Sequence, residues 1–131
     1  MAKAVESPVG QPGFFYDTPD GYFYGFPAID ARGLKVAQHT GGEVVTDPLQ
    51  VDRELDVTEQ AQVAIFLQKF LPAVSSEATD HAICLYSMTA DEHFIVDRHP
   101  EHGQVVFAAG LSGHGFKFTS VLGSILADLA V

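Results

Sequence analysis

The sequence predicts a mixed α+β fold: an antiparallel sheet with one helix, followed by further strands and a second helix. Aromatic and β-branched runs separated by turn residues fill residues 14–39, which is typical of hairpins. Apolar residues recur at steps of three and four within residues 56–71 and within residues 118–129, which is typical of helices. The chain has 131 residues, of which 47% are hydrophobic, so it is long enough to bury one core of ordinary size.

The first part of the chain predicts three short antiparallel strands within residues 14–39. Turn residues at 19–21 and 30–33 separate the three runs. In the third run, LKVAQH, the strand period of two places Lys35 and His39 on the same face. A charged residue and a titratable ring therefore share one side of the predicted sheet.

One helix of about four turns is predicted over residues 56–71. Asp56 and Glu59 have the spacing of a capping box, and Pro72 ends the segment. The apolar residues at helical spacing are Val63, Phe66, Leu67 and Phe70. The small and polar residues 73–80 then predict a crossing between structural layers.

The last third predicts three strands, at residues 81–88, 93–97 and 104–110. The third is apolar without alternation, as expected of a strand that is covered on both faces. A glycine-rich loop and a helix over residues 118–129 follow it. This order turns the free amides of a helix N-terminus toward a ligand.

The glycine-rich loop, GLSGHGFKF at residues 110–118, leaves two interpretations open. Its three glycines permit positive φ and close approach of the backbone to an anion or an electron-poor ring, and Lys117 adds a positive charge. Alternatively, the loop is a tight turn that needs glycine for its geometry alone. Its spacing, G-x-x-G-x-G, differs from the dinucleotide fingerprint G-x-G-x-x-G, so the loop alone names no ligand.

The charge balance and the termini restrict the class of protein. Seven lysines and arginines against seventeen aspartates and glutamates give a formal charge of -10, which repels nucleic acid and anionic membrane surfaces. The N-terminal residues lack the apolar core of a signal peptide, and no apolar run is long enough to cross a bilayer. A single cysteine cannot form an intrachain disulfide, which fits a reducing compartment. We expect a soluble, cytoplasmic protein with an irregular leader over residues 1–12.

Two further groups carry weak chemical signals. Cys84 lies in an apolar run, where a cysteine is ordinarily a small inert hydrophobe, and no local nucleophile signature accompanies it, so protease chemistry is not expected. Within the segment DEHFIVDRHPEH, three histidines and the second aspartate have a spacing that matches no helical zinc pair and fits a solvated strand end. No metal site is therefore predicted from His93, Asp97, His99 and His102.

Four segments carry a resemblance to a known family: YFYGFPA, GLKVAQH, CLYSMTADEHFIVDRHPEH and AAGLSGHGFKFTSVLGSILADLA, in that order. They resemble the C-terminal part of the monomeric sarcosine oxidase and N-methyltryptophan oxidase family. These are amine oxidases with covalently bound FAD, within the D-amino acid oxidase-like superfamily of FAD-dependent oxidoreductases. The resemblance covers residues 21–130 and implies that residues 13–76 are part of a substrate-binding domain. It implies that residues 77–131 are the C-terminal part of a FAD-binding domain whose N-terminal dinucleotide-binding part is absent.

The resemblance implies roles for individual residues. Cys84 matches the cysteine whose sulfur is joined to the 8α carbon of the flavin. Lys35 matches the catalytic lysine beside the flavin N5, where a fixed ammonium stabilises superoxide. His39, also assigned to catalysis, lines the substrate cavity together with Tyr24 and Tyr86.

The resemblance also assigns the glycine-rich loop to the pyrimidine end of the flavin. There the backbone amides, the helix dipole and a lysine favour the anionic reduced ring. The resemblance implies that Lys117 also helps to hold the substrate carboxylate. The implied cofactor-binding residues of the loop are Gly113, His114, Gly115, Phe116 and Lys117.

The implied reaction oxidises a secondary amine, of the sarcosine, N-methyl amino acid or pipecolate type, to an imine while O2 is reduced to hydrogen peroxide. Because the chain has no glycine-rich dinucleotide turn, we expect the isolated chain neither to hold FAD nor to turn over. Residues 104–110 would then lack sheet neighbours, which predicts self-association or a partner chain that supplies the missing half. The alternative is a non-catalytic, stand-alone binding or interaction module.

Overall fold

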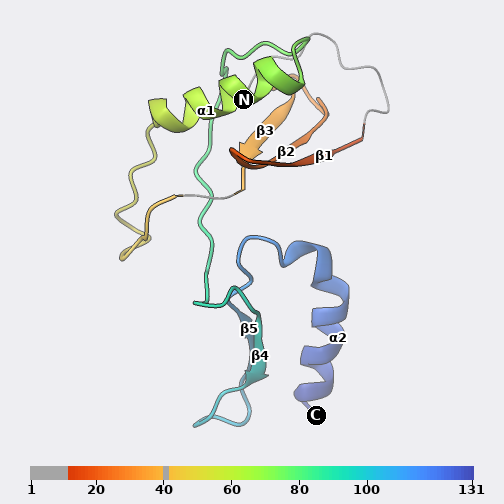
Figure 1. Cartoon of the computed structure of the whole chain (residues 1–131). Coiled ribbons are helices and arrows are strands. Elements are labelled where there is room, and N and C mark those ends of the chain that lie inside the picture. The colour runs from red at the N-terminus through yellow and green to blue at the C-terminus, as the bar shows by residue number, and fades with distance from the viewer. Residues whose placement is uncertain (1–11, 40–41) are drawn as a thin grey trace. The chain divides into compact units, whose positions relative to one another are not determined.

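A computed structural model describes residues 12–39 and 42–131, so the predicted leader lies almost entirely outside the described residues. The chain divides into two compact units, Met1–Ile83 and Cys84–Val131 (Figure 1). The described residues form two antiparallel sheets and two α-helices, which confirms the predicted mixed fold. The two domain ranges implied by the resemblance, with a change at residue 77, stay a prediction.

The first unit contains the three predicted strands, β1 (Phe14–Thr18), β2 (Gly21–Phe26) and β3 (Lys35–Gln38). They are antiparallel and lie in the order β1-β2-β3. The turn between β1 and β2 uses Gly21 at a φ of 123°, and the hydroxyl of Thr18 donates to its carbonyl at 2.7 Å. The prediction of hairpins from aromatic runs and turn residues is confirmed.

The turn between β2 and β3 is closed by Asp30. The N–H of Gly33 donates to the Asp30 carbonyl at 3.2 Å, and the Arg32 guanidinium lies 2.6 Å from the Asp30 carboxylate. The hydrogen bonds from Arg32 lower the pKa of Asp30 to about 2. The pair is solvent-exposed, so it contributes mainly to the shape of the turn.

The helix of the first unit, α1 (Val57–Phe70), begins where the sequence predicts. The N–H groups of Thr58 and Glu59 donate to Oδ1 of Asp56, at 2.6 and 3.0 Å, so this carboxylate caps the helix. The helix ends before Pro72, with a hydrogen bond of 2.8 Å from the N–H of Leu71 to the carbonyl of Leu67.

The core of the first unit lies between α1 and one face of the sheet, as Figure 1 shows. The rings of Phe23 and Phe66 stack with their centroids 4.4 Å apart, and both residues are 2% exposed. Because side chains alternate along a strand, the residues of β2 that flank Phe23 point to the other face. Within the described residues of the first unit, α1 packs on the Phe23 side of the sheet and not on that other face.

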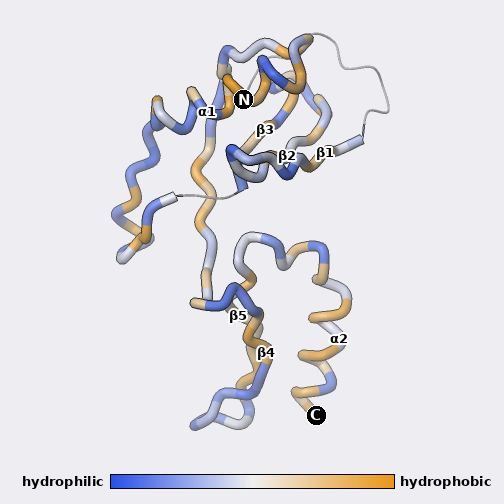
Figure 2. The backbone as a smooth tube through the Cα atoms, in the orientation of Figure 1, coloured by the Kyte–Doolittle hydropathy of each residue, from blue (hydrophilic) through white to orange (hydrophobic). Residues whose placement is uncertain are grey.

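The second unit contains β4 (Ile95–Arg98), β5 (Val106–Ala109), a short 3₁₀-helix η1 (Phe116–Phe118) and α2 (Thr119–Leu129). The two strands are antiparallel, and α2 packs beside them (Figure 1). The apolar residues at helical spacing over residues 118–129 predict one buried stripe. Hydrophobic residues do recur along α2 (Figure 2), but no residue of α2 is buried, so the predicted burial is wrong. The predicted order of strand, glycine-rich loop and helix is therefore confirmed.

Two expectations for the second unit are corrected. Residues 81–88 form no strand, although their composition favours one, because extended backbone becomes a strand only beside a hydrogen-bonding neighbour. All four residues of β5 are only half-buried rather than covered, since β4 is the one strand that pairs with it in the part of the chain that the structure describes. Neither of the two described helices is long and apolar enough to span a membrane.

Candidate functional site

The first group of candidate residues lies on the face of the β1-β2-β3 sheet opposite to α1. Tyr24 is paired with Ala37 and Phe26 with Lys35, so the register brings Tyr24, Phe26 and Lys35 to one side. Nζ of Lys35 lies 3.2 Å from the Tyr24 hydroxyl, 4.7 Å from the centre of the Tyr24 ring and 5.5 Å from that of Phe26. The His39 ring lies 6.2 Å from the Tyr24 ring, so the strand period correctly placed Lys35 and His39 together.

Further aromatic side chains on this face were not singled out from the sequence. Phe15, Tyr22 and Phe26 are 60%, 40% and 51% exposed, and the rings of Phe15 and Tyr22 stack at 5.9 Å. They can be identified from FFYDT and YFYGF, because side chains alternate between the two faces of a strand and the register shows which of them share a face. Together these residues make an accessible aromatic surface around one ammonium group.

The second group lies in the second unit, and the placement of its residues is described within that unit alone. Cys84 is exposed, so it is not the buried hydrophobe that its apolar neighbours suggest. Tyr86 packs against the glycine-rich loop, where a Cβ added to Gly113 would lie 2.4 Å from the Tyr86 ring. The segment that carries the cysteine and the loop that follows β5 are thus in direct contact.

The glycines of the loop are required by the packing of the loop itself. Gly113 has a φ of 74°, which residues other than glycine rarely adopt. The Tyr86 ring occupies the space where a Cβ of residue 113 would lie. At Gly110 and Gly115 an added Cβ would lie 2.4 Å from Thr89 and 2.7 Å from Leu111. These contacts favour the interpretation that the three glycines serve the geometry of the turn.

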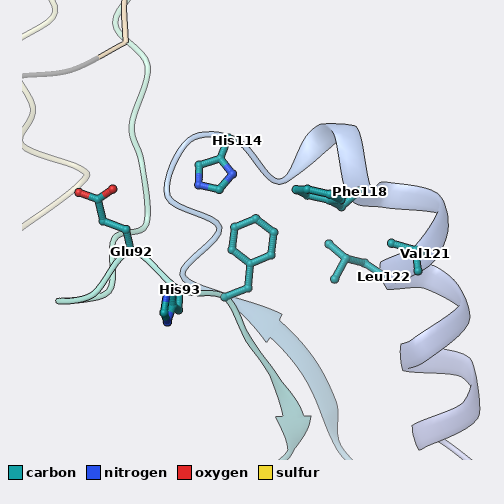
Figure 3. A pocket seen from close by; sticks show the side chains of 7 residues that line it. Glu92, His93, His114, Phe118, Val121 and Leu122 are labelled. Carbon is teal, nitrogen blue, oxygen red and sulfur yellow. The ribbon is translucent and has the colours of Figure 1, made fainter. Parts of the chain in front are cut away.

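The side chains of His114, Phe116 and Lys117, in the same loop, differ in their accessibility. Nδ1 of His114 is buried and makes no hydrogen bond to any described residue. Phe116 is 94% exposed, and Lys117 is exposed with its Nζ 5.3 Å from the centre of the Phe118 ring. An open apolar hollow of about 380 Å³ lies beside His114, between the loop, the residues that lead into β4, and α2 (Figure 3).

Ser112 is a site residue that sequence reasoning missed. It is 3% exposed and has a φ of 46°, in the left-handed region that a serine seldom adopts. A serine between two glycines gives no sequence signal of burial or of such a backbone conformation. Of the histidines singled out as a weak metal signal, His93 lines the hollow beside His114, whereas His99 and His102 lie between β4 and β5. No three potential metal ligands gather anywhere within residues 12–39 and 42–131.

Comparison with known proteins gives close relatives over nearly the whole chain. A monomeric sarcosine oxidase from Bacillus sp. (strain B-0618) is 45% identical over 122 residues, which are 92% of this chain and 31% of that protein. Another, from Arthrobacter sp. (strain TE1826), is 41% identical over 131 residues, which are 98% of this chain and 33% of that protein. An N-methyl-L-tryptophan oxidase from Escherichia coli O139:H28 (strain E24377A / ETEC) is 40% identical over 121 residues, or 91% and 32% of the two chains.

The chain therefore spans about a third of the length of these relatives. Residues 2–129 match the family described as FAD dependent oxidoreductase. This match includes both units and every candidate residue described above. Because it covers almost all of the sequence, the chain belongs to the family of FAD-dependent oxidoreductases, as the resemblance implied.

Proposed function

We propose that this chain supplies the substrate-facing sheet and the cofactor tether of an amine oxidase. The reaction converts the secondary amine of an N-methyl or cyclic amino acid to an imine, with two electrons and two protons passing to O2 to give hydrogen peroxide. The position of Lys35 carries this proposal: its ammonium is held at 3.2 Å from the Tyr24 hydroxyl on an accessible aromatic face. The names of the relatives, sarcosine oxidase and N-methyl-L-tryptophan oxidase, support the substrate class.

The residues of the second unit fit a flavin. The Cys84 thiol is exposed, as a covalent tether to a bound ring requires. The unpartnered Nδ1 of His114 can donate to or accept from a polar edge, and Lys117 brings an exposed positive charge to the same loop. We propose that Cys84 holds the FAD covalently and that residues 113–117 contact its pyrimidine end.

The chemistry divides between the cofactor and the chain. FAD, when bound, supplies the two-electron step, taking a hydride equivalent from the amine and returning the electrons to O2. Lys35 is proposed to stabilise the negative charge that develops on oxygen, because a fixed ammonium needs no reorganisation as that charge forms. Its hydrogen bond to Tyr24 and its place above the Tyr24 and Phe26 rings restrain it before the reaction.

The remaining candidate residues are proposed to bind the substrate. An N-methyl amino acid presents an apolar methyl group, an amine and a carboxylate. Tyr24 and His39, on the sheet of the first unit, are proposed to contact the methyl group and the amine. Tyr86, in the second unit, is proposed as a further substrate-binding residue. Lys117, whose side chain is exposed, would pair with the carboxylate.

The proposal is tested by joining this chain to the N-terminal part of the Bacillus sarcosine oxidase. We expect the joined protein to retain flavin absorbance after acid precipitation and to produce hydrogen peroxide from sarcosine or another N-methyl amino acid. Cys84→Ser should abolish the acid-stable flavin. Met88→Ser, which changes another exposed residue of the same segment, should retain it. Equal flavin retention in the two variants would refute the tether.

The purified 131-residue chain gives an independent comparison. A colourless monomer that melts cooperatively and binds small amines would support the alternative of a stand-alone binding module. A colourless aggregate that becomes a yellow monomer on joining would support the oxidase.

A further inference from the structure

Ser112 combines three properties that are seldom found together in one residue. It is polar, it is 3% exposed, and its backbone is left-handed with a φ of 46°. A residue with a Cβ stays in this region only where its surroundings determine the conformation. The contacts of Ser112 therefore indicate what the loop is built to hold in place.

Ser112 forms two hydrogen bonds, one to another segment and one within its own loop. Its N–H donates to the carbonyl of Ser87 at 3.0 Å, which joins the loop to the segment that carries Cys84. Its hydroxyl donates to the carbonyl of Gly110 at 3.1 Å, which closes the start of the loop on itself. The first bond sets the register between two segments, and the second holds the backbone that makes the first bond.

The next residue along each segment adds a second contact. Tyr86 precedes Ser87, Gly113 follows Ser112, and the Tyr86 ring occupies the place of the missing Cβ of Gly113. Two successive contacts, one hydrogen bond and one ring on a glycine, allow a single register between the segments. A shift by one residue would break both.

We propose that Ser112 is a positioning residue that fixes the spacing between the Cys84 thiol and the loop of residues 113–117. This inference rests on the proposed function, because a rigid ring system joined at one end and held at the other needs both attachments at a constant distance. Ser112 acts through its backbone and through Gly110 rather than by touching the ligand.

The role is tested by NMR in the joined protein, which supplies the half that the isolated chain is expected to need. Ser112→Ala keeps the Cβ and the N–H and removes only the hydroxyl bond to Gly110. Ser112→Gly also removes the hydroxyl but relieves the left-handed strain, so it provides the comparison if the alanine variant loses a dispersed spectrum. Ser124→Ala is the matched control, because it removes an exposed hydroxyl bond of 3.4 Å within α2.

Two NMR signals report the register between the Cys84 segment and the glycine-rich loop. The Tyr86 ring current should shift an Hα resonance of Gly113, and Tyr86→Leu identifies that shift by removing it. We expect Ser112→Ala to reduce the shift and to speed exchange of the residue 112 amide by about fivefold, the effect of losing one ordinary hydrogen bond. Ser124→Ala should change neither. An unchanged shift and unchanged exchange in Ser112→Ala would overturn the proposal.

A second readout separates this inference from the proposed function. In the joined oxidase, Ser112→Ala should carry severalfold less acid-stable flavin per protein than the parent, measured by absorbance. If the joined oxidase without substitutions carried no covalent flavin, the proposed function would be refuted, and with it the purpose of the spacing. The NMR signals would still show whether Ser112 fixes the register between the two segments. A loaded parent with equal loading in Ser112→Ala would refute the positioning role alone.

Discussion

The ammonium of Lys35 donates a hydrogen bond to the hydroxyl of Tyr24 at 3.2 Å and lies 4.7 Å from the centre of the same ring. The two residues come from neighbouring antiparallel strands, so the sheet register rather than a flexible loop sets their distance. These contacts fix the position of the ammonium on the face of the sheet that α1 does not cover. Such pre-organisation is what stabilisation of a developing negative charge requires.

This pair leads to a kinetic prediction for the joined oxidase. Lys35→Met should slow reoxidation of the reduced flavin by O2 on the order of a hundredfold, because one fixed charge is removed from the reacting oxygen. Reduction of the flavin by substrate should change far less. Stopped-flow absorbance in separate anaerobic and aerobic half-reactions measures the two rates.

The control is Lys69→Met, which removes an exposed lysine of α1 that lies 3.8 Å from Asp20. Both half-reactions should keep the parent rates in this variant. If Lys35→Met slowed reduction and reoxidation equally, its assigned role in oxygen chemistry would be wrong.

Sequence patterns predicted the elements whose signals are local. The turns at residues 19–21 and 30–33, the Asp56 cap and the 3.6-residue period of α1 each depend on residues close together in the chain. The shared face of Lys35 and His39 also followed, since it needs only the strand period of two.

Features that depend on contacts across the chain could not be predicted in this way. Residues 81–88 have strand composition, yet strand formation depends on a neighbour that composition does not specify. The hydrogen bond from the N–H of Ser112 to the carbonyl of Ser87 joins segments on either side of the β4–β5 hairpin, so no local pattern reveals it. Cys84 is likewise exposed although its neighbours in sequence are apolar, because the exposure of a side chain depends on tertiary packing, which local composition does not specify.

The stacked core predicts a large difference between two neighbouring residues of α1. Phe66 is 2% exposed and stacks on Phe23, so Phe66→Ala should lower the free energy of unfolding by roughly 3–5 kcal/mol. Ile65 is 61% exposed, so Ile65→Ala should change it by about 0.5 kcal/mol or less. Urea unfolding followed by far-UV circular dichroism measures both. Similar losses would show that the aromatic stack is not the core.

The cap of α1 predicts a pH dependence of stability. The backbone hydrogen bonds from Glu59 and Thr58 lower the pKa of Asp56 below its ordinary value of 3.8. A lowered pKa in the folded state means that this stabilisation is present above the unfolded pKa and is lost as the pH falls through the folded pKa. The melting temperature of the first unit should therefore fall in acid, in part because Asp56 takes up a proton.

Asp56→Asn isolates this contribution. The amide keeps an oxygen that accepts from the same N–H groups but carries no charge, so the fall of melting temperature with acid should be shallower than in the parent. Glu77→Gln removes an exposed carboxylate that caps no helix and should keep the parent's slope. Parallel acid profiles for parent and Asp56→Asn would contradict the assigned role of the cap.

The contact between Tyr86 and Gly113 predicts opposite effects of alanine at two glycines of the second unit. Gly113→Ala places a Cβ 2.4 Å from the Tyr86 ring at a φ of 74°. It should lower the free energy of unfolding by at least about 1 kcal/mol, because the left-handed backbone and the collision both oppose it. Gly123 lies within α2 with nothing within 4 Å of an added Cβ. Gly123→Ala should therefore raise the free energy by about 0.5–1 kcal/mol, through the helix propensity of alanine. Urea unfolding distinguishes the two signs, and a neutral Gly113→Ala would mean that the loop does not close on Tyr86 in solution.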